Sequence, residues 1–176
     1  VLGHTPILRV LRCLPMKRKF WIDTDTASDD AVALIMAFMH PDVDVVGVSV
    51  VAGNVPLGMG VQNALYTAEL CGATMPIYAG AAKPLSRDLG TAQFVHGEDG
   101  MGDIGLPLTG RTPTPGSGVD KLIEALHAHS GHIELVTLGP LTNIALALQQ
   151  DPNIAKTVKR CVVMGAVADH IGNVTQ

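Results

Sequence analysis

Short apolar runs alternate with segments of helical spacing along most of the chain, and this alternation constrains the fold more than any other feature. Regular alternation of this kind predicts an α/β protein with a mainly parallel sheet flanked by helices. Strands are predicted over residues 19–23, 44–51, 76–79, 132–138 and 160–164. Helices are predicted over residues 28–39, 56–71, 119–130 and 141–150. A Gly-, Pro- and Thr-rich stretch, residues 80–118, is predicted to be mostly loop with a functional or mobile character.

Four carboxylates lie within eight residues where the first predicted strand meets the first predicted helix: Asp23, Asp25, Asp29 and Asp30. Packing them together costs repulsion and desolvation unless a positive charge lies among them. A hard divalent cation such as Ca²⁺ or Mg²⁺ meets this need, since both prefer carboxylate oxygens. The competing interpretation is a capped helix, with Ser28 as N-cap and two acids in the first turn. Capping leaves Asp23 and Asp25 unexplained.

Unusual polar segments also follow three other predicted strands. They are Val51-Ala52-Gly53-Asn54, Gly139-Pro140-Leu141-Thr142-Asn143 and Met164-Gly165. In parallel α/β sheets, ligands bind at the carboxyl ends of the strands. Four strand ends that face one crevice therefore predict a single site.

Composition excludes several classes of function. With 47% apolar and 16% charged residues in 176, the chain suits one globular domain with a sizeable core. A net charge of −4 and 3% aromatic residues argue against nucleic-acid partners. No apolar run approaches the roughly 18 residues that a membrane span needs. The three cysteines are widely spaced, which favours a reducing cytoplasm over a disulfide framework or a zinc site.

The two ends of the chain carry expectations of their own. Residues 1–18 are basic and contain no acid, and we expect an extension outside the fold, with Met16 as a candidate natural start and an organelle transit peptide as the alternative. Residues 19–176 are expected to form the N-terminal portion of a single domain. The last predicted strand is followed by no helix, so the domain is expected to be cut short.

Five segments, in this order, resemble the inosine–uridine nucleoside hydrolases. They are DTDTASDD (residues 23–30), AGN (52–54), HGEDGMG (96–102), GPLTNIALAL (139–148) and VVMGA (162–166) followed by GN (172–173). The resemblance implies the Rossmann-like nucleoside-hydrolase fold with one tightly bound Ca²⁺. It also implies hydrolysis of the N-glycosidic bond of purine or pyrimidine ribonucleosides to ribose and a free base, by an enzyme that forms homodimers or homotetramers.

Roles for individual residues follow from the resemblance alone. Asp25, Asp30 and the backbone carbonyl of Leu138 match Ca²⁺ ligands, and Asp25 also matches the general base for a Ca²⁺-bound water. Five residues match the substrate side: Asp29 and Asn173 at the ribose hydroxyls, Asn54 near the attacking water and sugar, His96 at the base, and Met164 near the sugar. Asp25, Asn54 and His96 are therefore the expected catalytic residues.

The chain also departs from the family pattern. Thr26-Ala27 replaces the usual Pro-Gly, but the acid spacing is kept, so metal ligation is expected to survive. The family's later ribose, metal and leaving-base residues have no counterpart here. The 176-residue chain alone is therefore expected to be weakly active or inactive, and its parent an active hydrolase.

Two other functions compete with nucleoside hydrolysis. A haloacid-dehalogenase-like phosphatase also places DxD after a strand, with an aspartyl nucleophile and Mg²⁺, and Thr137 could mimic its second motif. Ala27 is wrong for that family, however, and it leaves Asp29 and Asp30 unexplained. A non-catalytic protein that binds Ca²⁺ or ribose is the second alternative.

Overall fold

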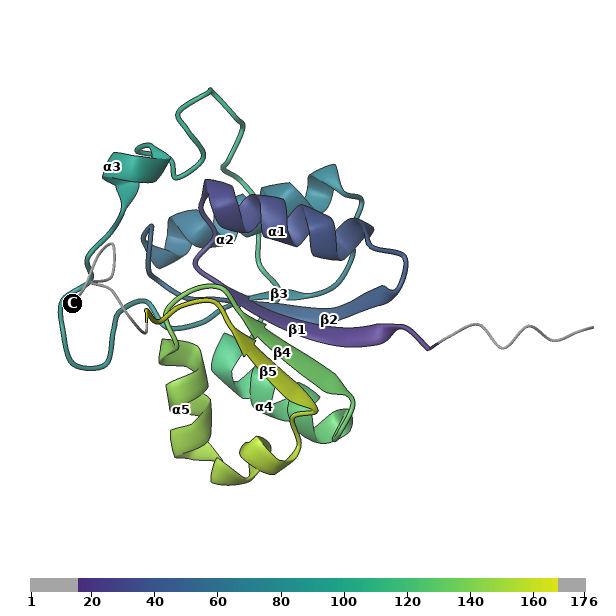
Figure 1. Ribbon diagram of the computed structural model, residues 1–176. Helices are drawn as coiled ribbons and strands as arrows, with labels where there is room; N and C mark the ends of the chain where they lie inside the picture. The colour runs from purple at the N-terminus through teal and green to yellow at the C-terminus, as the bar shows by residue number, and fades with distance from the viewer. Residues whose placement is uncertain (1–15, 168–176) are drawn as a thin grey trace, which may run out of the picture.

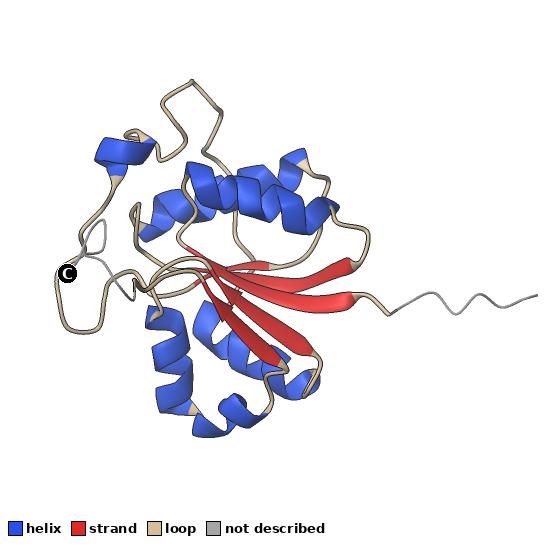
Figure 2. Ribbon diagram, viewed as in Figure 1, coloured by secondary structure: helices blue, strands red, loops and turns tan. Residues whose placement is uncertain are grey.

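Five parallel strands form one sheet in the computed structural model, which describes residues 16–167 (Figure 2). The strands are β1 (Arg18–Thr24), β2 (Val43–Val50), β3 (Ile77–Ala79), β4 (Ile133–Thr137) and β5 (Arg160–Val163). Their order across the sheet is β3-β2-β1-β4-β5, so β1 is central and the chain crosses over β1 to reach β4. The predicted α/β class with a parallel sheet is confirmed.

Helices cover both faces of this sheet (Figure 1). One face carries α1 (Ser28–Met39) and α2 (Leu57–Leu70), and the other carries α4 (Gly118–Ala128) and α5 (Thr142–Gln150). The long loop after β3 contains a short helix, α3 (Gln93–His96), and a 3₁₀ helix, η1 (Pro152–Lys156), precedes β5. Within residues 16–167, no helix has both the length and the apolar character that crossing a membrane requires.

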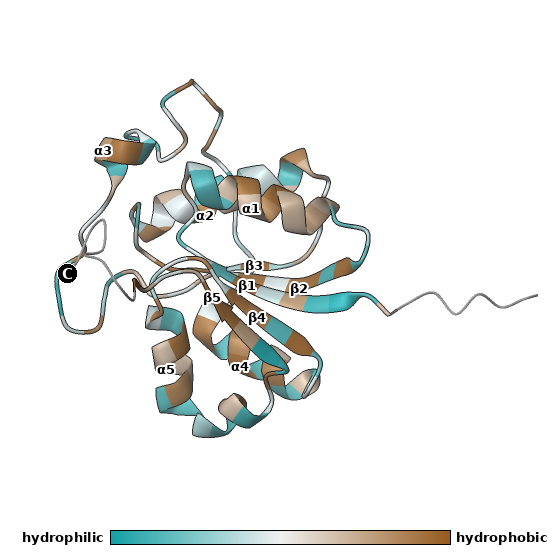
Figure 3. Cartoon of the chain, viewed as in Figure 1, coloured by the Kyte–Doolittle hydropathy of each residue, from teal (hydrophilic) through white to brown (hydrophobic). Residues whose placement is uncertain are grey.

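Two hydrophobic cores lie against the two faces, because successive side chains of a strand point to opposite sides. Trp21 of β1 packs with Leu122 and Leu126 of α4, whereas the next residue, Ile22, packs with Leu34 of α1 and Ala64 of α2. Figure 3 shows the hydrophobic residues along β2, β4 and β5. The same alternation continues to the end of β1, where the neighbouring polar residues Asp23 and Thr24 point to opposite faces of the sheet.

The predicted helix over residues 28–39 matches α1, but its predicted N-cap is wrong. Ala27 occupies the N-cap position, and no side chain accepts a hydrogen bond from the helix there. Ser28 is already helical, and its hydroxyl pairs with His96 instead. Ser28 Oγ, which could have capped the helix, makes this tertiary contact instead. The long loop differs too, since α3 was not expected within residues 80–118.

A buried carboxylate joins three strands at the opposite edge of the sheet from the acidic segment. Glu134 of β4 has a side chain only 4% exposed, and it accepts bonds from Arg18 of β1 (2.5 Å), Lys159 (3.2 Å) and Arg160 of β5 (2.7 Å). The Arg18 guanidinium, together with the two other cations, lowers the pKa of Glu134 to about 2. This acid therefore stabilises the fold above its ordinary pKa of 4.5, and that contribution is lost as pH falls from 4.5 to about 2.

Glu134→Gln is expected to lower the free energy of unfolding at pH 7 by about 2 kcal/mol, because charge-assisted hydrogen bonds from three cations are lost. The difference from wild type should shrink below pH 4, where wild-type Glu134 itself becomes protonated in the unfolded state. Urea unfolding at pH 7 and pH 3 measures both effects. The control is Glu124→Gln, which removes the charge of an exposed side chain paired with Lys121 and should change stability little. An equal loss at both pH values would contradict the role assigned to the charge.

Candidate active site

Asp23, near the end of β1, belongs to a buried hydrogen-bond network. Its Oδ2 accepts from Ser49 of β2 and from Asn143 Nδ2 of α5 (2.8 Å), and Trp21 Nε1 donates to the Ser49 hydroxyl (2.9 Å). Burial raises the pKa of Asp23 to about 7. Its Oδ1 is buried and has no hydrogen-bond partner among the described residues. Asp23 thus links β1, β2 and α5 beneath the site.

Asp25 and Asp30 form a buried pair of carboxyl groups just beyond β1. Each is only 3% exposed. Asp25 Oδ2 accepts from the backbone N–H of Asn54 (2.6 Å), and Asp30 Oδ2 accepts from Thr24 Oγ1 (2.5 Å). Burial raises both pKa values, that of Asp30 to about 7, and the charge of Asp29 raises both further. Within residues 16–167, no Lys or Arg forms an ion pair with either acid.

Two glycines allow neighbouring loops to approach Asp25 closely. A Cβ on Gly53, after β2, would collide with the Asp25 carboxylate and lie 2.7 Å from Pro140 Cδ. A Cβ on Gly139, after β4, would lie 2.7 Å from Asp25 Oδ1 and 2.9 Å from its backbone N. Only glycine therefore fits at either position. The predicted convergence of the ends of β1, β2 and β4 is confirmed by these contacts.

The donors at this edge suit a hard divalent cation. Two buried carboxylates without a cationic partner leave negative charge that such an ion would neutralise. The backbone carbonyl of Leu138 belongs to the peptide bond that leads into Gly139, which adjoins Asp25. No group of three or more His, Cys, Asp or Glu side chains gathers as a metal site among the described residues. Asp25 and Asp30 would therefore hold such an ion with backbone carbonyl and further oxygens, since Ca²⁺ takes six to eight.

His96 lies at the same edge of the sheet, although it is far from the acids in sequence. It is the last residue of α3, and its Nδ1 lies 3.0 Å from Ser28 Oγ and 3.8 Å from Asp29 Oδ1. The His96 side chain is mostly buried, whereas Asp29 is 57% exposed. Asn54 is half-buried, and its carbonyl accepts from Ala92 N (2.8 Å), which ties the loop after β2 to the start of α3. The structure thus brings Asp29, Asn54 and His96 to one region.

The remaining predicted substrate residues lie farther along the chain. Met164 directly follows β5, and its N–H donates to Thr137 O at the end of β4 (2.8 Å), so it reaches the same edge. Its side chain is exposed. Asn173 lies outside the described residues.

Three polar residues near the site carried no predicted role. Ser49 and Asn143 hold Asp23, while Asn63 of α2 is fully buried and binds the backbone of two site loops. Asn143 lies in the GPLTN segment, which marked it only as unusual. One feature of the sequence could have drawn attention to Asn63. It is an amide on the face of α2 that otherwise carries Gly60, Ala64 and Thr67.

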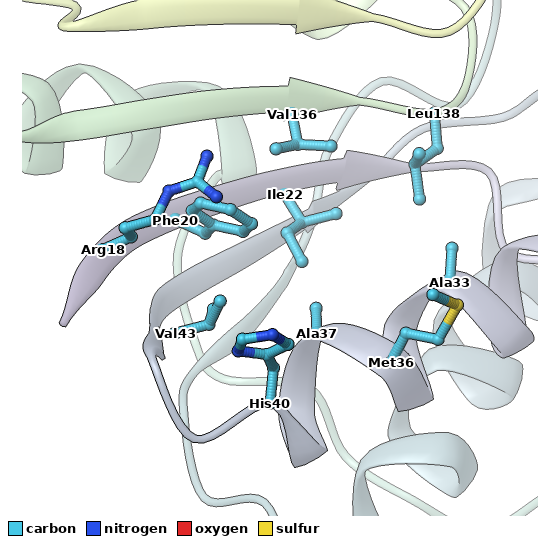
Figure 4. A pocket seen from close by; sticks show the side chains of 10 residues that line it. All are labelled: Arg18, Phe20, Ile22, Ala33, Met36, Ala37, His40, Val43, Val136 and Leu138. Atoms are coloured by element: carbon cyan, nitrogen blue, oxygen red, sulfur yellow. The ribbon is translucent and has the colours of Figure 1, made fainter.

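An apolar hollow beside α1 is a separate feature from this site. Figure 4 shows it between α1 and strands β1 and β4, lined by Phe20, Ile22, Met36, Val136 and Leu138 among others. Its lining includes no carboxylate. The polar and charged groups that chemistry requires lie instead around Asp25.

Comparison with known proteins gives a consistent result. Residues 20–176 match the family model described as inosine-uridine preferring nucleoside hydrolase. The chain is 37% identical over 158 residues to uridine nucleosidase 1 of Arabidopsis thaliana, covering 89% of this chain and 47% of that protein.

Solved structures agree with the sequence match. A plant nucleoside hydrolase superposes with a TM-score of 0.85 at 37% identity, covering 90% of this chain and 51% of the other. A purine-preferring ribonucleoside hydrolase from Gardnerella vaginalis superposes with a TM-score of 0.84 at 32% identity, covering 90% and 52%. The chain therefore spans about half the length of the relatives that it matches.

Proposed function

The chain belongs to the inosine-uridine preferring nucleoside hydrolase family, and from this premise we propose that the protein hydrolyses the N-glycosidic bond of ribonucleosides to ribose and a free base. The observation that carries the proposal is the buried pair Asp25 and Asp30, held at the carboxyl edge of the sheet beside Asp29 and His96. Because the chain belongs to this family, the phosphatase alternative is dropped. That alternative also left Asp29 and Asp30 without a role.

We propose Ca²⁺ as the ion at Asp25, Asp30 and the Leu138 carbonyl. The family is generally metal-dependent, and an all-oxygen donor set of carboxylates and carbonyls suits Ca²⁺. When bound, Ca²⁺ would supply charge that orients a water and the vicinal hydroxyls of ribose. Two otherwise uncompensated carboxylates support this assignment, because a buried pair of like charges is costly without a cation.

Asp25 is the proposed general base. Water attacks C1′ of the ribose, Asp25 takes a proton from that water, and the C1′–N bond breaks with its electron pair leaving on the base. Burial raises the pKa of Asp25 in the metal-free protein, and a bound cation would favour its ionised form, which is the form that accepts a proton. The Asn54 N–H fixes the carboxylate through Oδ2. Proton transfer to a positioned base of this kind contributes about 10²–10⁴-fold to rate.

The other site residues would hold the nucleoside. Asp29 is exposed beside the buried pair, where its oxygens can accept from ribose hydroxyls. His96 adjoins Asp29 and would face the base, while Asn54 would lie near the water and the sugar. Met164 and Asn173 are proposed on the sugar side. Because these groups chiefly recognise ribose, both purine and pyrimidine ribonucleosides are proposed as substrates.

Base release from inosine, uridine and cytidine tests the proposal directly. The protein in its full natural length should release base with Ca²⁺ present, and an excess of a Ca²⁺ chelator should lower the rate at least about 100-fold. Calorimetry with Ca²⁺ should give one site that Asp30→Asn weakens. Turnover unaffected by the chelator would refute the role of the metal. Assaying residues 1–176 alone tests the expectation of weak or absent activity, and ribose binding without turnover would support the non-catalytic alternative.

We also propose that residues 19–176 form a portion of one domain and that the protein is a cytoplasmic homodimer or homotetramer. Of the extension expected over residues 1–18, Arg18 belongs to the fold, since it begins β1 and pairs with Glu134. The family match from residue 20 supports the boundary. Cys71 and Cys161 form no disulfide within residues 16–167, which supports a reducing compartment. Exposed Val32, Met36 and Met39 on α1 offer an apolar surface for self-association.

A further inference from the structure

Ser28 lies at the start of α1, where a capping side chain is expected, yet its hydroxyl contacts His96. Its Oγ lies 3.0 Å from His96 Nδ1 and makes no capping bond to α1. Asp29 Oδ1 lies 3.8 Å from the same nitrogen. Ser28 and Asp29, the first two residues of α1, therefore both approach one ring nitrogen of His96. In the described part of the chain, Nε2 makes no hydrogen bond to protein.

Hydrogen bonds that do not involve Ser28 hold the backbone around His96 in place. Gly102 N donates to His96 O (2.8 Å), which closes the HGEDGMG turn on itself. Asn63 Nδ2 donates to Asp99 O in that turn and to Thr26 O in the acidic loop, both at 3.1 Å. One fully buried amide thus bridges the two loops that carry His96 and the acids. The loop position is set by Asn63, which leaves the orientation of the ring to Ser28.

We infer that Ser28 is a positioning residue for His96, holding Nδ1 so that Nε2 is presented to the nucleoside. This inference rests on the proposed function for the identity of the ligand. The carboxylate of Asp29 near Nδ1 favours the proton on that nitrogen. Nε2 is then the unprotonated, accepting nitrogen of the neutral ring. His96 therefore accepts a hydrogen bond from an N–H or O–H of the bound nucleoside.

Nitrogen-15 NMR of the histidine rings tests the geometry without any need for turnover. In wild type, His96 should give the shifts of a ring protonated at Nδ1, and His96→Ala identifies the signals by their loss. Ser28→Ala should raise the share of the tautomer protonated at Nε2, because only Asp29, at 3.8 Å, then remains beside Nδ1, and Ser28→Thr, which keeps the hydroxyl, should restore the wild-type pattern. The matched control is Ser86→Ala, an exposed serine in the long loop. A His96 ring protonated at Nε2 in wild type, or unchanged by Ser28→Ala, would overturn the inference.

Kinetics with uridine in the full-length protein give the second test. Ser28→Ala should lower kcat/KM about threefold to tenfold, the worth of one hydrogen bond, chiefly through kcat. Ser28→Thr should recover most of this loss. In a His96→Ala background, Ser28→Ala should have no further effect, because the two residues act as a unit. An equal loss in both backgrounds would assign Ser28 a role apart from His96. If wild type releases no base, the proposed function fails while the NMR result still decides the role of Ser28.

Discussion

Asp25→Asn is expected to reduce base release about 10²–10⁴-fold, because the amide cannot take a proton from the attacking water. The variant should retain the hydrogen bond from Asn54 N–H, since the side-chain carbonyl of asparagine is still an acceptor. Loss of activity would then reflect lost charge and basicity rather than lost packing. Initial rates with inosine and uridine, together with Ca²⁺ titration by calorimetry, measure the change.

The same substitution should stabilise the metal-free fold. Burial raises the pKa of Asp25, so its proton is held more tightly in the folded than in the unfolded state. Such an acid destabilises the fold as pH rises above its unfolded pKa, because ionisation then opposes burial. With Ca²⁺ chelated, Asp25→Asn should raise Tm at pH 8 by about 2–5 °C and change it little at pH 4.

The control for both effects is Asp44→Asn. Asp44 is partly exposed and pairs with Lys19 at the start of β1, far along the strand from the site. It should leave base release unchanged and alter stability by less than about 1 kcal/mol. An Asp25→Asn protein that releases base within tenfold of wild type would remove Asp25 from the role of general base.

Gly53→Ala is expected to lower base release at least about 100-fold, through displacement of Asp25. The new methyl group would occupy the space of the Asp25 carboxylate and press on Pro140. Overpacking of this kind also costs about 1–3 kcal/mol of stability. Ca²⁺ affinity should fall together with activity, since the same carboxylate serves both.

Gly58→Ala separates this close approach from the general effect of replacing a glycine. Gly58 lies in the first turn of α2, and a Cβ there meets nothing within 4 Å. It should be neutral or stabilising by up to about 1 kcal/mol, because alanine favours a helix. If both variants kept full activity and Ca²⁺ affinity, Gly53 would have no part in placing Asp25.

The period of apolar residues was enough to locate every strand and the four long helices within a few residues. Trp21 and Ile22 show why, since each side of β1 needs its own apolar partners and the alternation is visible in the chain. The short helix α3 and η1 escaped detection, because four or five residues carry too little periodicity. Backbone hydrogen bonds from neighbouring loops stabilise α3 instead.

The acidic segment could likewise be recognised from the spacing of its acids alone. The different contacts that each acid makes could not be predicted from that spacing. Strand alternation sends Asp23 toward Ser49 and Asn143, while Asp25 and Asp30 meet beyond the strand. Ser28 shows the limit most clearly: its position predicted a cap, and a histidine 68 residues later in the chain receives its hydroxyl instead. No local pattern encodes a contact of that range.

For this chain, residue order settles the α/β architecture, the strand ends that carry polar groups and the family, because periodicity and short motifs are local properties. Packing decides which oxygens are buried without a cation, which glycines must lack a Cβ and which nitrogen of His96 is held. Those outcomes depend on contacts between segments that are distant in sequence. Asn63 exemplifies them, since a single buried amide bridges two loops that the amino-acid order keeps more than seventy residues apart.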